Sequence, residues 1–257
     1  MRLPGLLRLI VRNFASNVDP AAMMIRFGQP AFLVVILGTM FSGLVSPSAT
    51  SSGSYMAFLV PGAIAFQMVA GGVIAGNLFW LDRRWSMVEQ IFVGPFRRAE
   101  YLASLILTAL VFSLVGVGIM VVVALPFIGL PSLTLPELGV VLATIALGGI
   151  FFSTFLIGLG TQLRSANTYF TIQSFVQLFV VFLSTVYYPI TDKTPKVLVD
   201  VLYCNPLTYA ATAVRDAFEG QVGAPVYAAL GILSGLCLLT FVLATWGFRT
   251  MEPGAVQ

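Results

Sequence analysis

The sequence predicts an all-α membrane protein with six transmembrane helices, organised as one transmembrane domain over residues 1–257. Hydrophobic residues make up 58% of the chain, charged residues only 9%, and the mean hydropathy is +0.97. Soluble domains carry about 25% charged residues. Charged residues are also absent from five long stretches, which are 27–81, 101–136, 138–163, 165–191 and 220–248. A bilayer core about 30 Å thick needs about 20 apolar helical residues, so the first stretch accommodates two spans and each other stretch one.

The basic residues indicate the orientation of these spans. Ten of the 13 fall in segments that would be cytoplasmic if the N-terminus is inside, and three fall in outer loops. The inner set is Arg2, Arg8, Arg12, Arg26, Arg83, Arg84, Arg97, Arg98, Arg164 and Arg249, and the outer set is Lys193, Lys196 and Arg215. Short cytoplasmic loops are enriched in Lys and Arg, so both termini are predicted to be cytoplasmic. The preference for Arg over Lys is typical of GC-rich bacterial coding, which favours a bacterial plasma membrane.

The composition also argues against several site types. The chain has no His, its carboxylates are scattered, and no phosphate-binding G-x-x-x-x-G-K-[ST] loop occurs. We therefore expect no catalytic residue, metal site or bound cofactor in this chain. The basic residues are dispersed among loops rather than gathered on one face, so no nucleic-acid partner is expected. Cys204 and Cys237 fall in an outer loop and a span, and both are predicted to be unpaired.

Residues 1–28 are predicted to form an interfacial helix on the cytoplasmic side. Apolar residues recur there at helical spacing, while Arg8 and Arg12 share another face. A signal peptide is the alternative, although the two arginines interrupt the apolar stretch and no A-x-A site follows. The Asp19-Pro20 and Gly28-Gln29-Pro30 sequences predict breaks before a first span at about 30–46.

The remaining spans follow from the uncharged stretches and the turns between them. After a polar turn at 46–54, they are predicted at about 55–80, 101–124, 138–162, 168–187 and 225–248, with an outer turn at 126–136 and an inner turn at 162–167. Gly72 and Gly76 lie four residues apart in the second span. That spacing favours close helix packing.

The loop at 82–100 is predicted to contain a short cytoplasmic helix from Met87 to Val93. Ser86 and Glu89 match a capping box, and Gly94-Pro95 ends the helix. So short a helix is unstable alone, so it must pack on its own spans or on a partner protein. Arg83, Arg84, Arg97 and Arg98 flank it. These arginines interact either with a partner protein or with the headgroups of anionic lipids.

The loop at 189–222 is predicted to form outer helices. Asn205 is a suitable N-cap, Pro206 suits the first helical position, and an apolar stripe follows as far as Gly220. A shorter apolar segment at 197–202 precedes it. Such an amphipathic helix would lie on the outer leaflet or dip into it, as an outer gate.

The fifth span carries a candidate polar stripe. Gln173, Gln177 and Ser184 share a face at offsets of four and seven, and Tyr187 and Tyr188 follow near the outer end. These residues either line a conduit for a transported molecule or hold the bundle together by interhelical hydrogen bonds.

Two stretches resemble the type-2 ABC exporter permeases. The first is Phe182-Leu-Ser-Thr-Val-Tyr-Tyr-Pro-Ile190 with Pro195, the Asn205-Pro-Leu-Thr-Tyr209 run and Arg215, which is similar to the closing signature of that family. The second is the loop from Arg84 to Pro95, which is similar to the family's first cytoplasmic coupling segment. The chain departs from the family at Thr185 and at Ser86 or Met87, where members often have Gly.

The resemblance implies a transport subunit with two kinds of protein partner. Two permeases, either identical or near-copies, would pair in the membrane above two copies of a cytoplasmic ATPase that binds ATP and Mg²⁺. The residues implied in ATPase coupling are Arg84, Ser86, Met87, Glu89, Gln90, Phe92 and Pro95. The extracellular gate would contain Asn205, Pro206, Tyr209 and Arg215, within a re-entrant helix pair. The N-terminal helix would be the family's elbow-like helix.

The transported molecule is left open at this stage. Short outer loops favour a drug, an antibiotic or a lipid-like amphiphile, and a polysaccharide or teichoic-acid exporter is the alternative within the same fold. Three alternatives of other kinds are an ATP-independent secondary transporter or channel, an intramembrane enzyme and a structural subunit. The first two would need an ion-binding or catalytic group at membrane depth, which the uncharged spans do not offer.

Overall fold

The computed structural model describes residues 5–43, 54–129, 132–191 and 194–250, and in these ranges the only regular secondary structure is helical. The helices are α1 (Gly5–Ala15), α2 (Pro20–Phe41), α3 (Tyr55–Arg84), α4 (Met87–Val93), α5 (Arg98–Ile128), α6 (Leu135–Gln162), α7 (Ala166–Phe182), α8 (Lys196–Tyr203), α9 (Pro206–Phe218) and α10 (Ala224–Thr250). Most of the predicted turn at 46–54, together with Arg2, Lys193 and the side chain of Arg249, lies outside the described residues.

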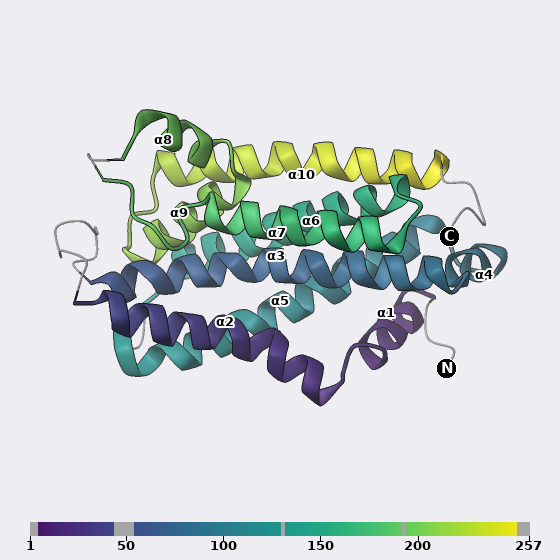
Figure 1. Ribbon diagram of the computed structural model, residues 1–257, viewed down its shortest axis with the longest axis horizontal. Coiled ribbons are helices and arrows are strands. Elements are labelled where there is room, and N and C mark those ends of the chain that lie inside the picture. The colour runs from purple at the N-terminus through teal and green to yellow at the C-terminus, as the bar shows by residue number, and fades with distance from the viewer. Residues whose placement is uncertain (1–4, 44–53, 130–131, 192–193, 251–257) are drawn as a thin grey trace.

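The long helices lie side by side and form one bundle (Figure 1). Five of them, α2, α3, α5, α6 and α10, are long and apolar enough to cross a membrane. The predicted fifth span corresponds to α7, which has 17 residues and so lies at the lower limit of the usual range for a span. The structure therefore confirms an all-helical, multi-pass membrane fold.

Helix α3 is the centre of the bundle, because it packs against α2, α5, α6 and α9. Close packing requires small residues at the contact points. A Cβ atom added to Gly72 would lie 2.5 Å from the Cβ atom of Phe152, and one added to Gly76 would lie 3.0 Å from the Cβ atom of Leu156. The prediction that these two glycines allow close helix packing is confirmed.

The predicted boundary of the first span is wrong. Helix α2 begins at Pro20, where the Asp19 side chain accepts a hydrogen bond of 2.9 Å from the Ala22 N–H, and it continues through Gly28 and Pro30 to Phe41. Asp19 and Pro20 thus form a helix start rather than a simple break. Pro30 is buried inside the helix and does not end it, as neighbouring helices often allow in membrane proteins. The separate N-terminal helix is therefore only α1, and Arg26 belongs to α2.

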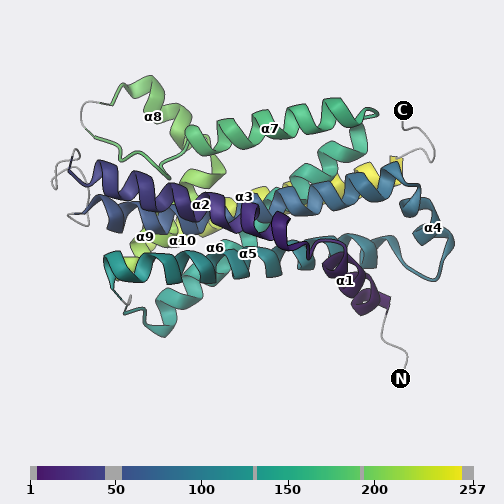
Figure 2. The ribbon, with the colours of Figure 1, turned by 60° about the horizontal axis from the view of Figure 1, so that its bottom comes forward.

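The two ends of the bundle carry different elements. Helices α1 and α4 and the end of α10 lie at one end, and α8 and α9 lie at the other (Figures 1 and 2). Helix α7 ends and α10 begins at this second end, and the α8–α9 pair between them bends by 86°. The chain therefore enters and leaves this pair at the same end of the bundle, and the re-entrant arrangement stays a prediction.

Substitution of Gly72 tests the close contact between α3 and α6. Gly72→Leu is expected to destabilise the fold by about 3 kcal/mol or more, because the added atoms meet the backbone of Phe152, which cannot move aside. Thermal unfolding in mild detergent measures the effect. Gly118→Leu on α5, where an added Cβ atom meets no atom within 4 Å, is the matched control. Equal stabilities of the two variants would contradict the packing argument.

Candidate functional site

The candidate coupling helix α4 stands at one end of the bundle, directly after α3 (Figure 1). It spans Met87–Val93, and the N–H of Gly94 closes it by donating to the Gln90 carbonyl oxygen at 3.1 Å. These bounds match the sequence prediction. Its position between α3 and α5 makes α4 the link between two long helices.

The predicted capping box of Ser86 and Glu89 is wrong. The Ser86 side chain makes no capping hydrogen bond, and its backbone is left-handed with φ 51°. The Ser86 N–H instead donates to the Arg83 carbonyl oxygen at 3.1 Å. Ser86 therefore belongs to the turn between the end of α3 and the start of α4. Glycine adopts this conformation most easily, which gives a physical reason for the glycines that the resembling family often has here.

One face of α4 is fixed to the bundle. Val88 and Ile91 are buried in the apolar core at this end, and Phe92 is half-buried. The ring of Phe92 lies edge-on to the rings of Tyr101 and Phe248, at centroid distances of 6.0 and 6.4 Å. Packing on its own spans therefore stabilises this helix, which is too short to be stable alone.

The other face of α4 is open and partly apolar. Trp85 is 69% exposed, Val93 is 90% exposed, and Met87 is also exposed. Among the predicted coupling residues, Arg84, Ser86, Met87, Gln90 and Pro95 are exposed, Glu89 is half-buried, and Phe92 packs inward. We call Trp85, Met87, Gln90, Val93 and Pro95 the α4 surface. Exposed apolar groups gathered at the end of a helix bundle are typical of a protein interaction site.

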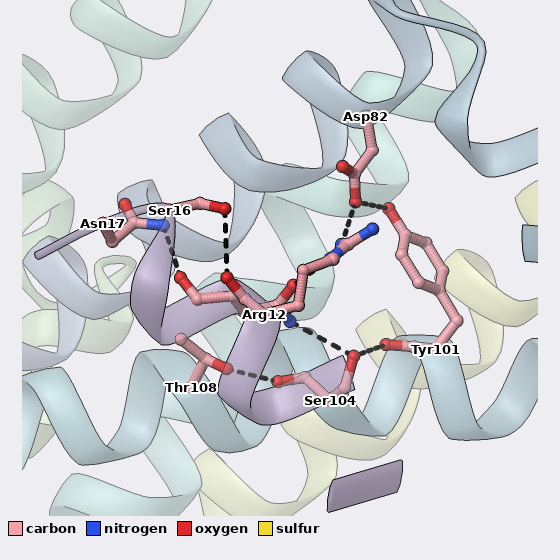
Figure 3. Close-up of polar contacts among 8 residues, drawn as sticks. Arg12, Ser16, Asn17, Asp82, Tyr101, Ser104 and Thr108 are labelled. Carbon is pink, nitrogen blue, oxygen red and sulfur yellow. Dashed lines mark hydrogen bonds and ion pairs between the residues drawn. The ribbon is translucent and has the colours of Figure 1, made fainter. Parts of the chain in front are cut away.

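A polar network joins α1 to the end of α3 (Figure 3). Arg12 forms an ion pair with Asp82, and the Tyr101 hydroxyl donates to the same carboxylate oxygen at 2.9 Å. Asn13 is fully buried and donates to the Ser104 hydroxyl at 3.3 Å. The Arg12–Asp82 contact is the one ion pair found within the described parts of the chain. Residue spacing does not predict it, because it depends on the contacts between α1, α3 and α5.

At the opposite end, Asn205 ties α9 to the end of α7. Its side-chain oxygen accepts from the Leu207 N–H at 2.9 Å, so the predicted N-cap is confirmed. Its amide nitrogen also donates to the carbonyl oxygens of Val180 and Leu183, at 2.6 and 2.8 Å. Pro206 occupies the first helical position as predicted, and Tyr209 is half-buried with its ring 6.4 Å from that of Tyr203.

Arg215 is buried rather than presented to water or lipid headgroups. Its guanidinium lies 3.8 Å from the centre of the Phe58 ring and donates to the carbonyl oxygens of Phe58 and Thr185, at 3.4 and 3.1 Å. Of the two predicted placements, the one in which α9 lies on the outer leaflet is therefore wrong. The helix is enclosed by α3, α6 and α10. Arg215 holds the segment after α7 against α3.

The candidate substrate path divides into two groups. Gln173 and Gln177 lie on α7, buried and half-buried, but α7 ends at Phe182. Ser184 lies beyond that end, and its hydroxyl donates to the Val181 carbonyl oxygen at 2.7 Å. The prediction that Ser184 shares a helical face with the glutamines is therefore wrong.

The two tyrosines after α7 have different environments. Tyr187 is buried, and its carbonyl oxygen accepts a hydrogen bond of 3.0 Å from the Tyr55 hydroxyl. Tyr188 is 52% exposed. The polypeptide from Ser184 to Tyr187 is thus fixed to α3, and Tyr188 is the member of this group that remains accessible.

Helix α7 lies at the edge of the bundle (Figure 2). Its outward side carries the exposed Phe175, Phe179 and Phe182, with the exposed Ser174 beside them, while half-buried Gln177 lies toward the side of Gln173. The Ser174 hydroxyl donates to the Phe170 carbonyl oxygen at 2.8 Å, so the outward side of α7 is mainly an exposed apolar face.

Comparison with known families supports the same interpretation. A family model described as ABC-2 type transporter matches residues 6–218, a range that includes helices α2 to α9 and most of α1. A comparison with curated proteins gave no match.

The turn at Ser86 can be tested by substitution. Ser86→Gly is expected to stabilise the fold by about 0.5–1 kcal/mol, because glycine adopts a left-handed backbone without a steric penalty. Ser86→Val is expected to destabilise it, because branched side chains are strained there. Thermal unfolding of the two variants and the parent measures both effects. A Ser86→Gly variant less stable than the parent would contradict the assigned turn.

Proposed function

This chain belongs to the ABC-2 type transporter family, and we propose that it is the permease subunit of an exporter driven by a separate cytoplasmic ATPase. Membership makes it a multi-pass transport subunit. The observation that supports the coupling mechanism best is the α4 surface, where apolar side chains stand exposed on a helix whose opposite face is fixed to the bundle.

The α4 surface would dock into a groove on the ATPase. Met87 and Val93 offer apolar area, while Arg84, Glu89 and Gln90 surround it with charge and hydrogen-bonding capacity. Apolar groups at the centre of an interface supply most of the binding energy, and charged groups at its rim set orientation and on-rate. This division between centre and rim fits a partner that must bind in one orientation.

A force applied to α4 would reach the spans directly. The helix is joined to α3 through two residues, Trp85 and Ser86, and its buried residues Val88 and Ile91 belong to the same apolar core as Leu102 and Leu105 of α5. The ion pair between Arg12 and Asp82 extends this unit to α1. ATP-driven closure of the ATPase would therefore move the inner ends of α3 and α5 together.

A second permease, identical or a near-copy, would face α7. The outward side of α7 would then border a conduit between two subunits, with half-buried Gln177 at its flank and exposed Tyr188 accessible from it. Gln173 lies behind them against the bundle. Arg215 and Asn205 hold the outer end of α7 in place, so their release would open the outer side. The phenylalanines on this face favour an apolar or amphipathic cargo such as a drug, an antibiotic or a lipid.

The orientation follows from the arrangement of the charges. Helices α1 and α4 and the C-terminal end of α10 lie at the same end of the bundle (Figure 1). This end of the bundle carries Arg8, Arg84 and Arg97. The positive-inside tendency would make that end cytoplasmic. A bacterial plasma membrane with both termini inside is the setting we propose.

Purification of the tagged chain from its native membrane tests the proposed function. An ATPase is expected to co-purify in about equal amount. Val93→Asp should lower its recovery about tenfold or more, because the charge would enter an apolar interface at a cost above about 1.4 kcal/mol. Quantitative mass spectrometry measures the ratio.

The matched control is Val197→Asp on α8, an equally apolar and well-exposed position at the other end of the bundle. It should leave the ratio unchanged. The docking role would be refuted by an ATPase that binds the Val93→Asp and Val197→Asp variants equally well, and the exporter assignment by the lasting absence of any ATPase.

A further inference from the structure

Five polar side chains with unsatisfied hydrogen-bonding groups lie on neighbouring turns of α3, α6 and α7. They are Asn77 and Trp80 of α3, Ser153 of α6, and Tyr169 and Gln173 of α7. Each has a buried polar atom without a hydrogen-bond partner among the described residues, namely Asn77 Oδ1, Trp80 Nε1, Ser153 Oγ, Tyr169 Oη and Gln173 Oε1. Trp80, Ser153 and Tyr169 are completely buried.

Contacts at Gly76 place these residues on neighbouring turns of the three helices. A Cβ atom added to Gly76 would fall in contact with the Tyr169 hydroxyl oxygen and 3.0 Å from Leu156 Cβ. Asn77 follows Gly76 directly, Ser153 precedes Leu156 by one turn, and Gln173 follows Tyr169 by one turn. The Trp80 and Tyr169 rings stack with centroids 5.0 Å apart and planes 6° apart. All five residues therefore lie within about one helical turn of the Gly76 contact.

Such a cluster is expensive to maintain at this depth. Buried polar atoms are almost always hydrogen-bonded, and within a bilayer bulk water does not pair them. Five unpaired atoms on neighbouring turns of three packed helices suggest a site that another molecule satisfies at some stage of the protein's working cycle.

The attachment of α7 would allow this. The side chains from Phe175 to Phe182 that point away from the bundle are exposed, and α7 packs on α3 and α6 with the opposite face. The stack of Trp80 on Tyr169 holds its inner half, and hydrogen bonds from Asn205 hold its outer end. Separation of α7 from α3 would expose the cluster without breaking a side-chain hydrogen bond at its centre.

We propose that Asn77, Trp80, Ser153, Tyr169 and Gln173 form a concealed binding site for an uncharged polar group of the transported molecule, which becomes accessible when α7 moves away from α3 and α6. The site rests on the proposed exporter function and specifies its cargo further. Trp80, Ser153 and Tyr169 supply donors, and the amide oxygens of Asn77 and Gln173 supply acceptors.

The chemistry of the site selects for hydroxyl, amide or glycosidic groups. None of the five side chains is charged, so a phosphate or ammonium group would be buried without compensation. The nearest cation that the contacts show is Arg83, 5.3 Å from the centre of the Trp80 ring. Its Nη1 already donates to the carbonyl oxygens of Gly160 and Leu163, at 2.5 and 2.7 Å.

The first test measures stability of the resting permease and needs no ATPase. Tyr169→Phe and Gln173→Leu each remove an unpaired buried atom, so each should raise the unfolding temperature by on the order of 2 °C. Ser113→Ala is the control, because the Ser113 hydroxyl donates to the Gln67 carbonyl oxygen at 3.0 Å. It should lower the temperature. A similar decrease for all three variants would mean that the cluster is already paired, which would overturn the proposal.

The second test measures access to the site in the complex with the ATPase. Ser153→Cys, in a background with Cys204→Ser and Cys237→Ser, should react with N-ethylmaleimide about tenfold faster with ATP and vanadate than without nucleotide. Ile145→Cys, buried on α6 in the apolar core, should stay unreactive in both states. An ATPase that co-purifies but leaves Ser153→Cys unreactive in every nucleotide state would overturn the site and not the exporter function.

Discussion

The close packing of α3 inside the bundle is the contact on which the rest of the structure depends. Gly72 and Gly76 bring the α3 backbone against α6 and α7. The buried side chains between α3 and its neighbouring helices form most of the core. Without a hydrophobic driving force between helices in lipid, such contacts supply much of the association energy. Two arginines add hydrogen bonds between helices at the two ends of the bundle. Arg83 binds the carbonyl oxygens at the end of α6, and Arg215 of α9 binds the Phe58 carbonyl oxygen near the start of α3.

The same helix connects the two candidate functional regions. Its C-terminal end turns at Ser86 into the α4 surface, and its N-terminal end holds the segment after α7 through Tyr55 and the carbonyl oxygen of Phe58. A rigid helix of 30 residues carries a displacement over its full length of about 45 Å. Helix α7 is different, because its outward side is open and its inner side covers unpaired polar groups. We therefore assign the rigid part of the proposed cycle to α3 with α4 and α5, and the mobile part to α7.

Local sequence signals predicted the elements whose ends depend on local chemistry. The end of α4 at Gly94 and the start of α9 at Asn205 and Pro206 follow from glycine, proline and an N-cap, whereas the predicted cap at Ser86 does not form. The failures arose where tertiary contacts override local preference. Pro30 continues α2 because it is buried in the bundle, and Arg215 is buried because backbone carbonyls and Phe58 solvate it. The unpaired groups behind α7 were beyond prediction for the same reason, although Gln173 was recognised as a polar residue in an apolar span.

The most direct test of this account is a pair of distance measurements by electron spin resonance on the permease–ATPase complex in lipid nanodiscs. Spin labels at Leu81 and Leu114 report on the end of α3 that carries α4 against α5, and labels at Leu114 and Leu178 report on α5 against α7. We expect the first distance to stay constant and the second to change when ATP and vanadate are added. A change between Leu81 and Leu114 with a fixed α7 would contradict the account, because α3 and α5 would then move independently of each other.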